Sequence, residues 1–399
     1  MEKNGVKINK QKLKKLSKSY HLELNKIQNQ IYKTAGQEFN INSPKQMSEV
    51  LFQKMGLAYK GMRKTSTGKY STKEEVLHKL KDEGHKIAEQ ILDYREYQKL
   101  LSTYIDSFPK HVQKDERLRA KFSQTGTTTG RLSSNDPNLQ NIPVGTEKGR
   151  EIRKAFEAEK GKLLVAFDYS QIELRIAAFL SKDEKLIDAF KKGLDIHTAV
   201  ASEVFSVDQE KVTKDQRRQA KVINFGILYG MGVTALQKNL GTDRKTAQSF
   251  YNQYFQSYLG LANYISDIKE ITAIKKYTET LFGRRRYFDG FNSPLPFIRA
   301  QAERMAVNAP IQGTQADLIK LVMVKIDEYL RKEKINDKVK LILQIHDEVI
   351  YEIDEDLLKK SNVTPKIIKI MENILTKEQT HGVPIIAKMA TGKNWGEMK

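Results

Sequence analysis

The sequence predicts an α+β fold in which helices dominate and a small set of strands carries key polar residues. Apolar residues repeat at intervals of three and four over long stretches, which is typical of packed helices. Three apolar runs, residues 163–167, 340–345 and 349–353, have the length and composition of strands. With 399 residues, the chain is long enough for two or three subdomains.

The composition is that of a folded protein outside the membrane. Hydrophobic residues make up 39% of the chain and charged residues 30%, which excludes a disordered tail. There is no apolar run of about eighteen residues, as a membrane span requires, and the polar start carries no signal segment. Cysteine is absent, so disulfides and thiolate metal sites are excluded. We therefore expect a cytoplasmic protein with no membrane partner.

The charge balance favours a polyanionic partner. Lys and Arg number 69 against 49 Asp and Glu, a formal net charge of +20. Such an excess suits nucleic acid, because each neutralised phosphate releases condensed counterions. Binding to a membrane surface, or simple solubility in a lysine-rich proteome, remain alternatives at this point.

The first hundred residues predict a helical hairpin that projects from the body. Apolar seams run through residues 13–32 and 87–105, with a compact insert between them. Within the insert, Lys60, Arg63 and Lys64 could contact a phosphate backbone, although an ordinary solvated loop fits the same residues. Ser71 and Glu74 predict a capping box at the start of the following helix.

A loop and a strand precede the first group of polar residues. Residues 125–143 are rich in Gly, Ser, Asn and Pro and predict a loop, in which Arg131 follows Gly130. The strand at 163–167 ends at Asp168, a rigid place for a metal ligand, and Ser170 with Glu173 predicts a capping box. The alternative is that Asp168 is only a turn residue and Glu173 only a cap.

The pattern from 183 to about 274 is helical, and we expect its aromatic stripe to be core. The stripe comprises Phe250, Tyr251, Tyr254, Phe255 and Tyr258.

One helix in this region carries an unusual stripe of side chains. We expect it to run from Thr213 to Tyr229, with a Thr213–Gln216 capping box at its start and Gly230 after its end. Spaced four residues apart on one face are Arg217, Lys221, Phe225 and Tyr229. Two cations followed by two aromatic rings suit the phosphates and the base of a nucleoside triphosphate. An amphipathic surface helix is the alternative.

The third polar group lies in a predicted β-hairpin. Apolar runs flank the turn His346-Asp347-Glu348, which would hold Asp347 firmly against a core. Acidic residues are common in turns, so an ordinary turn remains the alternative.

These segments together resemble the family A DNA polymerases, the group that contains bacterial DNA polymerase I. The strings D-Y-S-Q-I-E at 168–173, R-R-Q-A-K-V-I-N-F-G-I-L-Y-G at 217–230 and Q-I-H-D-E at 344–348 are similar to the family's three polymerase motifs. Further matching segments are T-G-R-L-S-S at 129–134, P-N-L-Q-N-I-P at 137–143 and N-A-P-I-Q-G-T at 308–314. All of them fall in the family's order.

The resemblance implies a right-hand fold whose palm is built on an antiparallel β-sheet. Residues 1–112 would form the thumb with a basic tip, and residues 113–190 the first part of the palm, which bears Asp168. Residues 191–290 would form the fingers with the nucleotide-binding helix 213–229. Residues 291–399 would complete the palm with the hairpin that bears Asp347.

The resemblance also implies a DNA-templated DNA polymerase with two Mg²⁺ ions, for which Mn²⁺ can substitute. Metal ligands would be Asp168, Asp347 and the backbone carbonyl of Tyr169, with Glu348 and Lys221 as further catalytic residues. His197, Arg217 and Lys221 would clamp the triphosphate. Phe225 would contact the incoming nucleotide, Tyr229 would stack near the template base, and Glu173 would exclude a ribose 2′-hydroxyl.

The partners implied are deoxynucleoside triphosphates and a primer–template duplex, bound by a monomer. Contacts with DNA are expected from a set of polar residues on several segments: Arg131, Asn138, Gln140, Asn141, Arg304, Gln312, His346 and the tip residues Lys60, Arg63 and Lys64. Many family members have Arg where this chain has Gly145, so a phosphate contact there is not expected unless Lys148 or Arg150 replaces it. We expect neither a proofreading exonuclease nor a flap nuclease.

Three other functions compete with this interpretation. A non-catalytic DNA-binding protein would have lost part of the metal or triphosphate residues, yet Asp168, Asp347, Arg217 and Lys221 are present. A two-metal nuclease would leave the stripe from Arg217 to Tyr229 without a purpose. Synthesis of DNA on an RNA template remains open as an additional activity, because duplex shape and the minor groove, not base identity, would be recognised.

Overall fold

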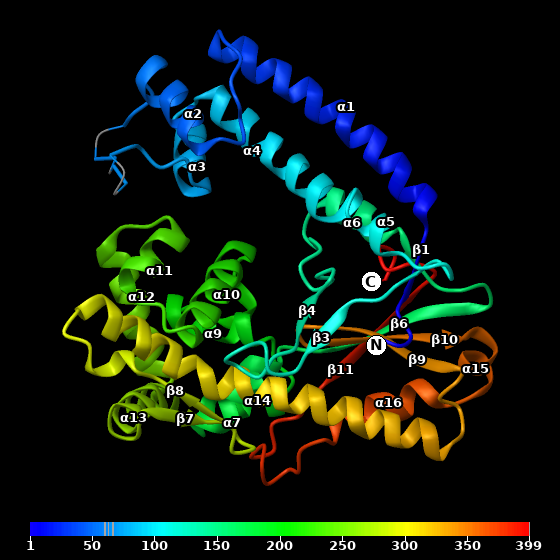
Figure 1. Ribbon diagram of the computed structural model, residues 1–399. Helices are drawn as coiled ribbons and strands as arrows, with labels where there is room; N and C mark the ends of the chain where they lie inside the picture. The colour runs from blue at the N-terminus through cyan, green and yellow to red at the C-terminus, as the bar shows by residue number, and fades with distance from the viewer. Residues whose placement is uncertain (60, 63, 66–67, 399) are drawn as a thin grey trace.

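A four-stranded antiparallel sheet lies at the centre of the molecule, in the strand order β11-β6-β10-β9 (Figure 1). The computed structural model describes residues 1–59, 61–62, 64–65 and 68–398. The strands are β6 (Lys162–Tyr169), β9 (Val339–Ile345), β10 (Glu348–Asp354) and β11 (Ala387–Gly392). The predicted strand at 163–167 and the predicted hairpin are both confirmed, and so is the α+β class.

Alternate residues of the sheet feed two separate cores. In β6, Val165 and Phe167 belong to one apolar cluster, whereas Leu164 and Ala166 belong to the other. The first cluster is covered by α7 (Ile172–Ser181), α14 (Pro296–Lys332) and α16 (Val363–Glu372), and the second reaches into the N-terminal helices. Successive side chains of a strand point to opposite faces. A slip by one residue would therefore turn each buried side chain to the wrong face, so the burial of both faces fixes the register.

An antiparallel pair of helices, the helical arm (residues 10–105), extends away from the sheet (Figure 1). The two long members are α1 (Lys10–Ala35) and α4 (Lys86–Leu100), and α4 continues into a π-helical turn, η2 (Leu101–Ile105). At the outer end, the tip contains α2 (Pro44–Ser48), η1 (Glu49–Lys54) and α3 (Glu74–Asp82). The predicted helical hairpin is confirmed.

The predicted capping box at the tip is wrong. Helix α3 begins at Glu74 with Lys73 as its N-cap, and no side chain caps it. The Ser71 hydroxyl accepts a hydrogen bond from the Lys73 backbone N–H instead, at 3.3 Å. This local bond, two residues along the chain, uses up the oxygen that a capping box needs.

A second group of helices, the helical lobe (residues 184–275), stands opposite the arm (Figure 1). It contains α8 (Glu184–Lys191), α9 (Ile196–Phe205), α10 (Lys214–Leu228), α11 (Val233–Leu240), α12 (Arg244–Ser257) and α13 (Leu259–Lys275). The Thr213–Gln216 capping box of α10 is confirmed, with both reciprocal bonds present. The aromatic stripe is core as expected, because Tyr254 and Tyr258 are buried and their neighbours pack against the same cluster.

One long helix and several short elements join the arm, the lobe and the central sheet. The 37-residue helix α14 runs from the lobe to the underside of the sheet (Figure 1). A small sheet with the order β2-β1-β5 connects the arm to the centre. The remaining bounds are β1 (Val6–Ile8), α5 (Phe108–His111), β2 (Arg117–Leu118), β3 (Lys121–Ser123), β4 (Ser133–Asn135), α6 (Glu147–Arg153), β5 (Phe156–Glu157), η3 (Gln209–Lys211), β7 (Tyr277–Glu279), β8 (Arg285–Tyr287), η4 (Gly290–Asn292) and α15 (Glu355–Lys360). Residues 125–143 are mostly loop, as predicted, and β4 is the exception.

A buried ion pair links the small sheet to the central one. The side chains of Arg117 and Glu352 are only 7% and 0% exposed, and their closest N–O distance is 3.2 Å. Arg117 also donates to Glu159 at 2.6 Å and to the backbone oxygens of Asn4 and Gly5. Because these four hydrogen-bond partners together accept from the buried guanidinium, its burial is compensated only while the whole set is intact.

No helix in the described part of the chain is both long enough and apolar enough to cross a bilayer.

We predict that Arg117→Ala lowers the free energy of unfolding by about 3–5 kcal/mol, since it removes the closest cation from the buried Glu352 carboxylate and leaves Lys162 at 3.6 Å and the Glu159 backbone N–H at 3.1 Å. Replacing both partners with methionine should cost less than this single change. Urea unfolding measures both. The exposed pair of Arg331 and Asp327 gives a matched control, for which Arg331→Ala should change stability by less than about 1 kcal/mol. Equal losses for the two arginines would contradict the role given to the buried pair.

Candidate active site

Three acidic residues meet where β6, β9 and β10 adjoin. Asp168 is the seventh residue of β6, Asp347 lies in the turn between β9 and β10, and Glu348 opens β10. The register of β6 and β10 pairs Asp168 directly with Glu348. A backbone hydrogen bond of 3.3 Å from Tyr169 N to Asp347 O closes the end of the ladder. The structure thus brings together Asp168 and Asp347, which lie 179 positions apart in the sequence.

The surroundings of the three acids disfavour their ionised forms. Asp168 reaches solvent but has protein on several sides, and this partial desolvation, with the charges of Asp347 and Glu348, raises its pKa to about 7. Burial also raises the pKa of Asp347. The pKa of Glu348 rises to about 7, again mainly through burial, although Arg153 opposes the shift. A cluster of this kind gains stability from any added positive charge.

The acids line a cavity of about 450 Å³. Its basic members are Arg153 and Lys388, and its apolar members include Trp395 and Met398. Arg153 stacks on the Trp395 ring at 4.0 Å and donates to the Ile142 backbone oxygen at 2.7 Å. These contacts hold Arg153 at the cavity wall, where its charge opposes the effect of burial on the pKa of Glu348.

The donor chemistry of the cavity fits Mg²⁺ or Mn²⁺. Both ions prefer carboxylate, carbonyl and water oxygens, which Asp168, Asp347 and the adjoining backbone carbonyl of Tyr169 can supply. In the described parts of the chain, no three or more His, Cys, Asp or Glu side chains are grouped closely enough to hold a metal ion by themselves. A bound ion would therefore need ligands from water or substrate as well, as is usual for Mg²⁺.

Glu173 connects the acids to the helical lobe. Its side chain, in a residue only 8% exposed, accepts from Arg131 at 2.5 Å and from the Tyr229 hydroxyl at 2.8 Å. The predicted Ser170–Glu173 capping box is wrong, because α7 has Gln171 as its N-cap, with φ of +54° and no side-chain cap. The stronger, charge-assisted bond to Arg131 takes the Glu173 carboxylate away from the helix end.

Two glutamines that sequence reasoning missed hold the turn with the acids. Gln315, from α14, accepts from Arg131 Nε at 3.2 Å and donates to the His346 backbone oxygen at 3.0 Å. Gln344 donates to the same oxygen at 2.8 Å. His346 needs this support because its φ of +53° is unusual for a residue with a side chain. Gln344 opens the segment 344–348 that matches the family, whereas Gln315 follows the matching segment 308–314 by one residue, so only Gln344 carried a signal in the sequence.

The α10 stripe reaches this region at its last member, Tyr229, which bonds to Glu173. Arg217 forms a two-bond ion pair with Asp195, at 3.1 and 2.7 Å. Burial alone would raise the pKa of Asp195, but hydrogen bonds from Arg217 and Thr198 outweigh it and lower the pKa to about 2. The His197 ring lies 5.8 Å from the Phe225 ring, and Tyr229 is 44% exposed at the helix end. Lys221 is exposed and has no ion-pair partner among the described residues.

The residues predicted to contact DNA fall into three places. Asn138, Gln140, Asn141 and His346 line one hollow of about 630 Å³ next to the acid cavity. Arg304 and Gln312 both lie on α14, and Gly230 at the end of α10 is packed against the Arg304 backbone. Lys64 forms an isolated β-bridge with Tyr70 in the segment between η1 and α3 at the tip of the arm, while Lys60 and Arg63 lie outside the described residues.

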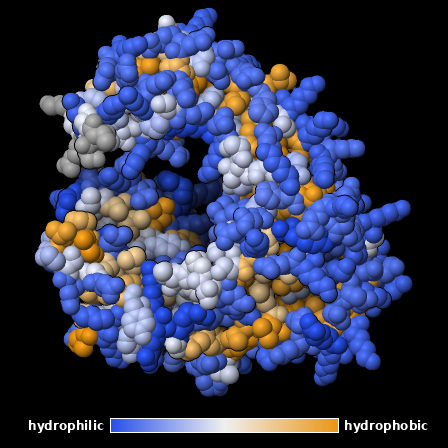
Figure 2. Space-filling view, in the orientation of Figure 1, coloured by the Kyte–Doolittle hydropathy of each residue, from blue (hydrophilic) through white to orange (hydrophobic). Residues whose placement is uncertain are grey.

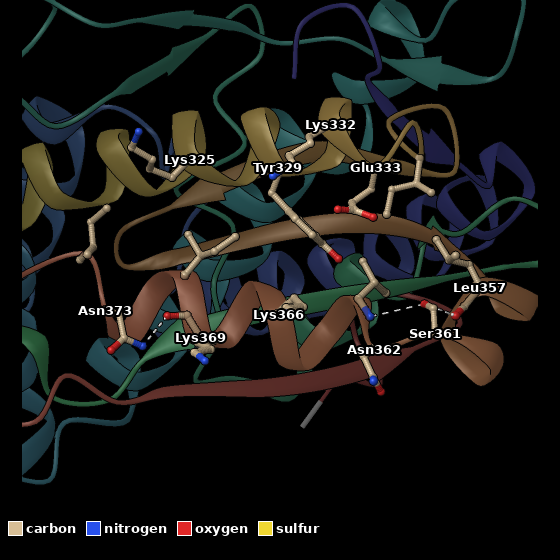
Figure 3. Close-up of a pocket in the computed structure, with 14 residues that line it drawn as sticks. Lys325, Tyr329, Lys332, Glu333, Leu357, Ser361, Asn362, Lys366, Lys369 and Asn373 are labelled. Carbon is tan, nitrogen blue, oxygen red and sulfur yellow. Dashed lines mark hydrogen bonds between the residues drawn. The ribbon is translucent and has the colours of Figure 1, made fainter.

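The space between the arm and the lobe is open and polar. Figure 2 shows a hollow there, with mostly hydrophilic residues around it. A larger cavity of about 830 Å³ lies elsewhere, between α14 and α16 on the opposite face of the sheet. In Figure 3 its Lys325 and Lys369 point away from each other, and none of the predicted site residues lines it. The acid cavity, and not this one, is therefore the candidate active site.

Comparisons with known proteins all lead to one family. The model described as "DNA polymerase family A" matches residues 10–397. Proteins named DNA polymerase I from Pseudomonas aeruginosa and Bacillus subtilis are 42% and 43% identical over the whole chain, which covers 42% and 44% of their lengths. A thermostable DNA polymerase I from Thermus filiformis is 44% identical, and 47% of it is covered. The chain thus spans less than half the length of these relatives.

One solved structure with the same fold is the "POL domain of Pol1 from M. smegmatis complex with DNA primer-template and dNTP". The TM-score is 0.91 at 35% identity, and the match covers 98% of this chain and 68% of that one. The predicted α+β polymerase fold is therefore confirmed.

We predict that Asp168→Asn stabilises the protein when divalent cations are removed with EDTA. The folded-state pKa of Asp168 is raised from 3.8 to about 7, so the stability that this group contributes at low pH is lost as the pH rises from about 4 to about 7. The melting temperature of the variant should exceed that of the wild type by about 2 °C at pH 8, and the gap should close toward pH 4. Calorimetry at both pH values tests this. A variant that melts below the wild type at pH 8 would contradict the electrostatic account.

Proposed function

The chain belongs to DNA polymerase family A, and we propose that it extends the 3′ end of a primer with deoxynucleotides along a DNA template. The observation that carries the proposal is the position of Glu173, whose charge adds to burial in raising the pKa of Asp347 on one side and whose carboxylate is bonded to Tyr229 at the end of α10 on the other. A site that can activate a hydroxyl as a nucleophile and a site for a triphosphate are thereby joined. A hydrolytic enzyme has no need of the triphosphate site.

Two Mg²⁺ ions are proposed as cofactors, held by Asp168, Asp347 and the Tyr169 carbonyl. When bound, such ions lower the pKa of the primer 3′-hydroxyl and neutralise charge on the departing pyrophosphate. Glu348 adds a third acid beside Asp168. The mutual repulsion of these acids, which adds to burial in raising their pKa values, supports the proposal, because a bound cation would relieve it.

Arg217, Lys221 and His197 are proposed to clamp the triphosphate. Arg217 is already held in an extended, two-bond geometry by Asp195, so little side-chain entropy is lost when phosphate replaces the carboxylate. Lys221 extends from the exposed face of α10 and can donate a proton to the leaving pyrophosphate. Phe225 would contact the nucleotide, and the exposed ring of Tyr229 would stack near the template base.

The duplex is proposed to lie in the polar hollow between arm and lobe. Residues 1–112 would act as the thumb, 191–290 as the fingers, and 113–190 with 291–399 as the palm. Arg131, His346 and the polar side chains of the neighbouring hollow would contact the primer end and minor groove, with Arg304 and Gln312 on α14. The tip with Lys64 would contact the backbone. Since the acids, Glu173 and the α10 stripe all come from one chain, we propose a monomer, working in the cytoplasm where bacterial DNA lies.

Primer extension on a DNA template with Mg²⁺ and four deoxynucleotides tests the proposal. We expect extension by the wild type and none by Asp347→Ala. A matched control is Asp327→Ala, an exposed acid on α14, which should extend normally. If no protein extends the primer although all bind it, a non-catalytic DNA-binding role replaces the proposal. Repeating the assay on an RNA template shows whether that activity is present too.

We predict that Glu173→Ala admits ribonucleotides. The change opens the space that the carboxylate fills and releases both Arg131 and Tyr229. Single-nucleotide incorporation should show the preference for deoxynucleotides reduced roughly tenfold or more. Glu173→Gln, which keeps the volume, should retain most of the preference, and Tyr229→Phe separates the effect of the lost hydroxyl bond. An unchanged preference for deoxynucleotides over ribonucleotides in Glu173→Ala would contradict the prediction.

A further inference from the structure

A buried chain of polar side chains crosses three helices of the lobe behind the proposed triphosphate site. It comprises His197 of α9, Asn224 of α10 and Tyr254 of α12, whose residues are 4%, 0% and 1% exposed. The Tyr254 hydroxyl is 3.1 Å from Asn224 Oδ1, and Asn224 Nδ2 is 3.1 Å from His197 Nδ1. Polar groups buried this deeply must satisfy one another, because water does not reach them.

The hydrogen-bonding capacities determine the direction of the chain. Among the residues that the structure describes, the Asn224 amide is the one partner of the Tyr254 hydroxyl. If the amide were reversed, its NH₂ would face the phenol oxygen and the hydroxyl proton would be buried without an acceptor, which is costly. The amide oxygen must therefore accept from Tyr254, and the NH₂ must donate toward His197.

This direction fixes the position of the histidine proton. Nδ1 of His197 receives a donor, so it must be the unprotonated nitrogen, and in the neutral ring the proton lies on Nε2. Among the described residues, Nε2 has no hydrogen-bond partner of its own. The ring thus presents one N–H donor that the protein itself does not use.

We propose that Asn224 and Tyr254 are positioning residues that hold His197 in its Nε2–H tautomer, so that the ring donates one hydrogen bond to the triphosphate of the incoming nucleotide. The inference rests on the proposed function, because it is that function which places the triphosphate beside His197, Arg217 and Lys221. Neither Asn224 nor Tyr254 touches the substrate in this account; they act only through the imidazole.

The surroundings of His197 keep this donor neutral at ordinary pH. Burial, aided by the cations Arg217 and Lys221 and opposed by Asp195, lowers the pKa of His197 to about 4. The centroid of the Phe225 ring lies 5.8 Å from the centroid of the imidazole ring. Arg217 and Lys221 then attract the phosphate by their charge. The neutral histidine adds one directed hydrogen bond, and its protonation does not change between pH 6 and pH 9.

Asn224→Asp inverts the arrangement with almost no change in shape. A carboxylate at this position can only accept, so it selects a proton on Nδ1 and raises the pKa of the ring. In the neutral ring Nε2 then becomes an acceptor that faces phosphate. Tyr254→Phe is the second variant, since it keeps the ring volume and removes only the hydroxyl that orients the amide.

The first readout is the ¹⁵N spectrum of protein labelled at histidine, in which the two neutral tautomers and the imidazolium have different shifts. The His197 signals are assigned by their loss in His197→Gln. We expect the Nε2–H tautomer in the wild type from pH 6 to pH 9, and the Nδ1–H tautomer or the imidazolium in Asn224→Asp. A proton on Nδ1 in the wild type would overturn the inference whether or not the protein is a polymerase.

The second readout is the KM for a deoxynucleoside triphosphate in single-nucleotide incorporation. For Asn224→Asp we expect a KM about tenfold above the wild type at pH 8, with the gap narrowing toward pH 6 as the ring gains its second proton. Tyr254→Phe should raise KM less, with no such pH dependence. If the tautomers are as expected but neither variant alters KM, the positioning role is overturned while the polymerase assignment, tested by primer extension, stands.

Discussion

Repulsion between like charges at one end of the central sheet is the constraint on which the rest of the molecule depends. The β6–β10 register sets Asp168 beside Glu348, and the turn adds Asp347. Such a cluster opposes folding unless rigid packing holds it in place. That packing comes from the alternation of β6 between two apolar cores, so that neither face of the sheet can shift.

The same constraint explains why the neighbouring side chains are tied to one another. Arg131 bonds to Glu173 and Gln315, Gln315 bonds to the turn at His346, and Glu173 bonds to Tyr229. The side chains of Arg131, Glu173 and Gln315 thereby join the loop at 125–143, the turn between β9 and β10, and the end of α10.

Local patterns predicted the elements well but predicted tertiary partners poorly. The helical seams, the α10 capping box and the hairpin follow from residues close in sequence, and all of them formed. The capping boxes at Ser71 and Ser170 failed because the Ser71 hydroxyl bonds to the Lys73 N–H and the Glu173 carboxylate bonds to Arg131. The supporting roles of Asp195, Asn224, Tyr254 and Gln315 depend on packing between distant helices, which periodicity does not encode. The roles of Lys60 and Arg63 stay a prediction, since they lie outside the described residues.

The central claim is that Asp168 and Asp347 hold the cations of a nucleotidyl transfer site. Electron paramagnetic resonance with Mn²⁺ counts the bound ions directly, in protein mixed with a dideoxy-terminated primer, template and the next deoxynucleotide. We predict two Mn²⁺ ions per wild-type chain and fewer when either aspartate is replaced by asparagine. The same count in the wild type and both variants would show that the ions bind elsewhere and would contradict the account.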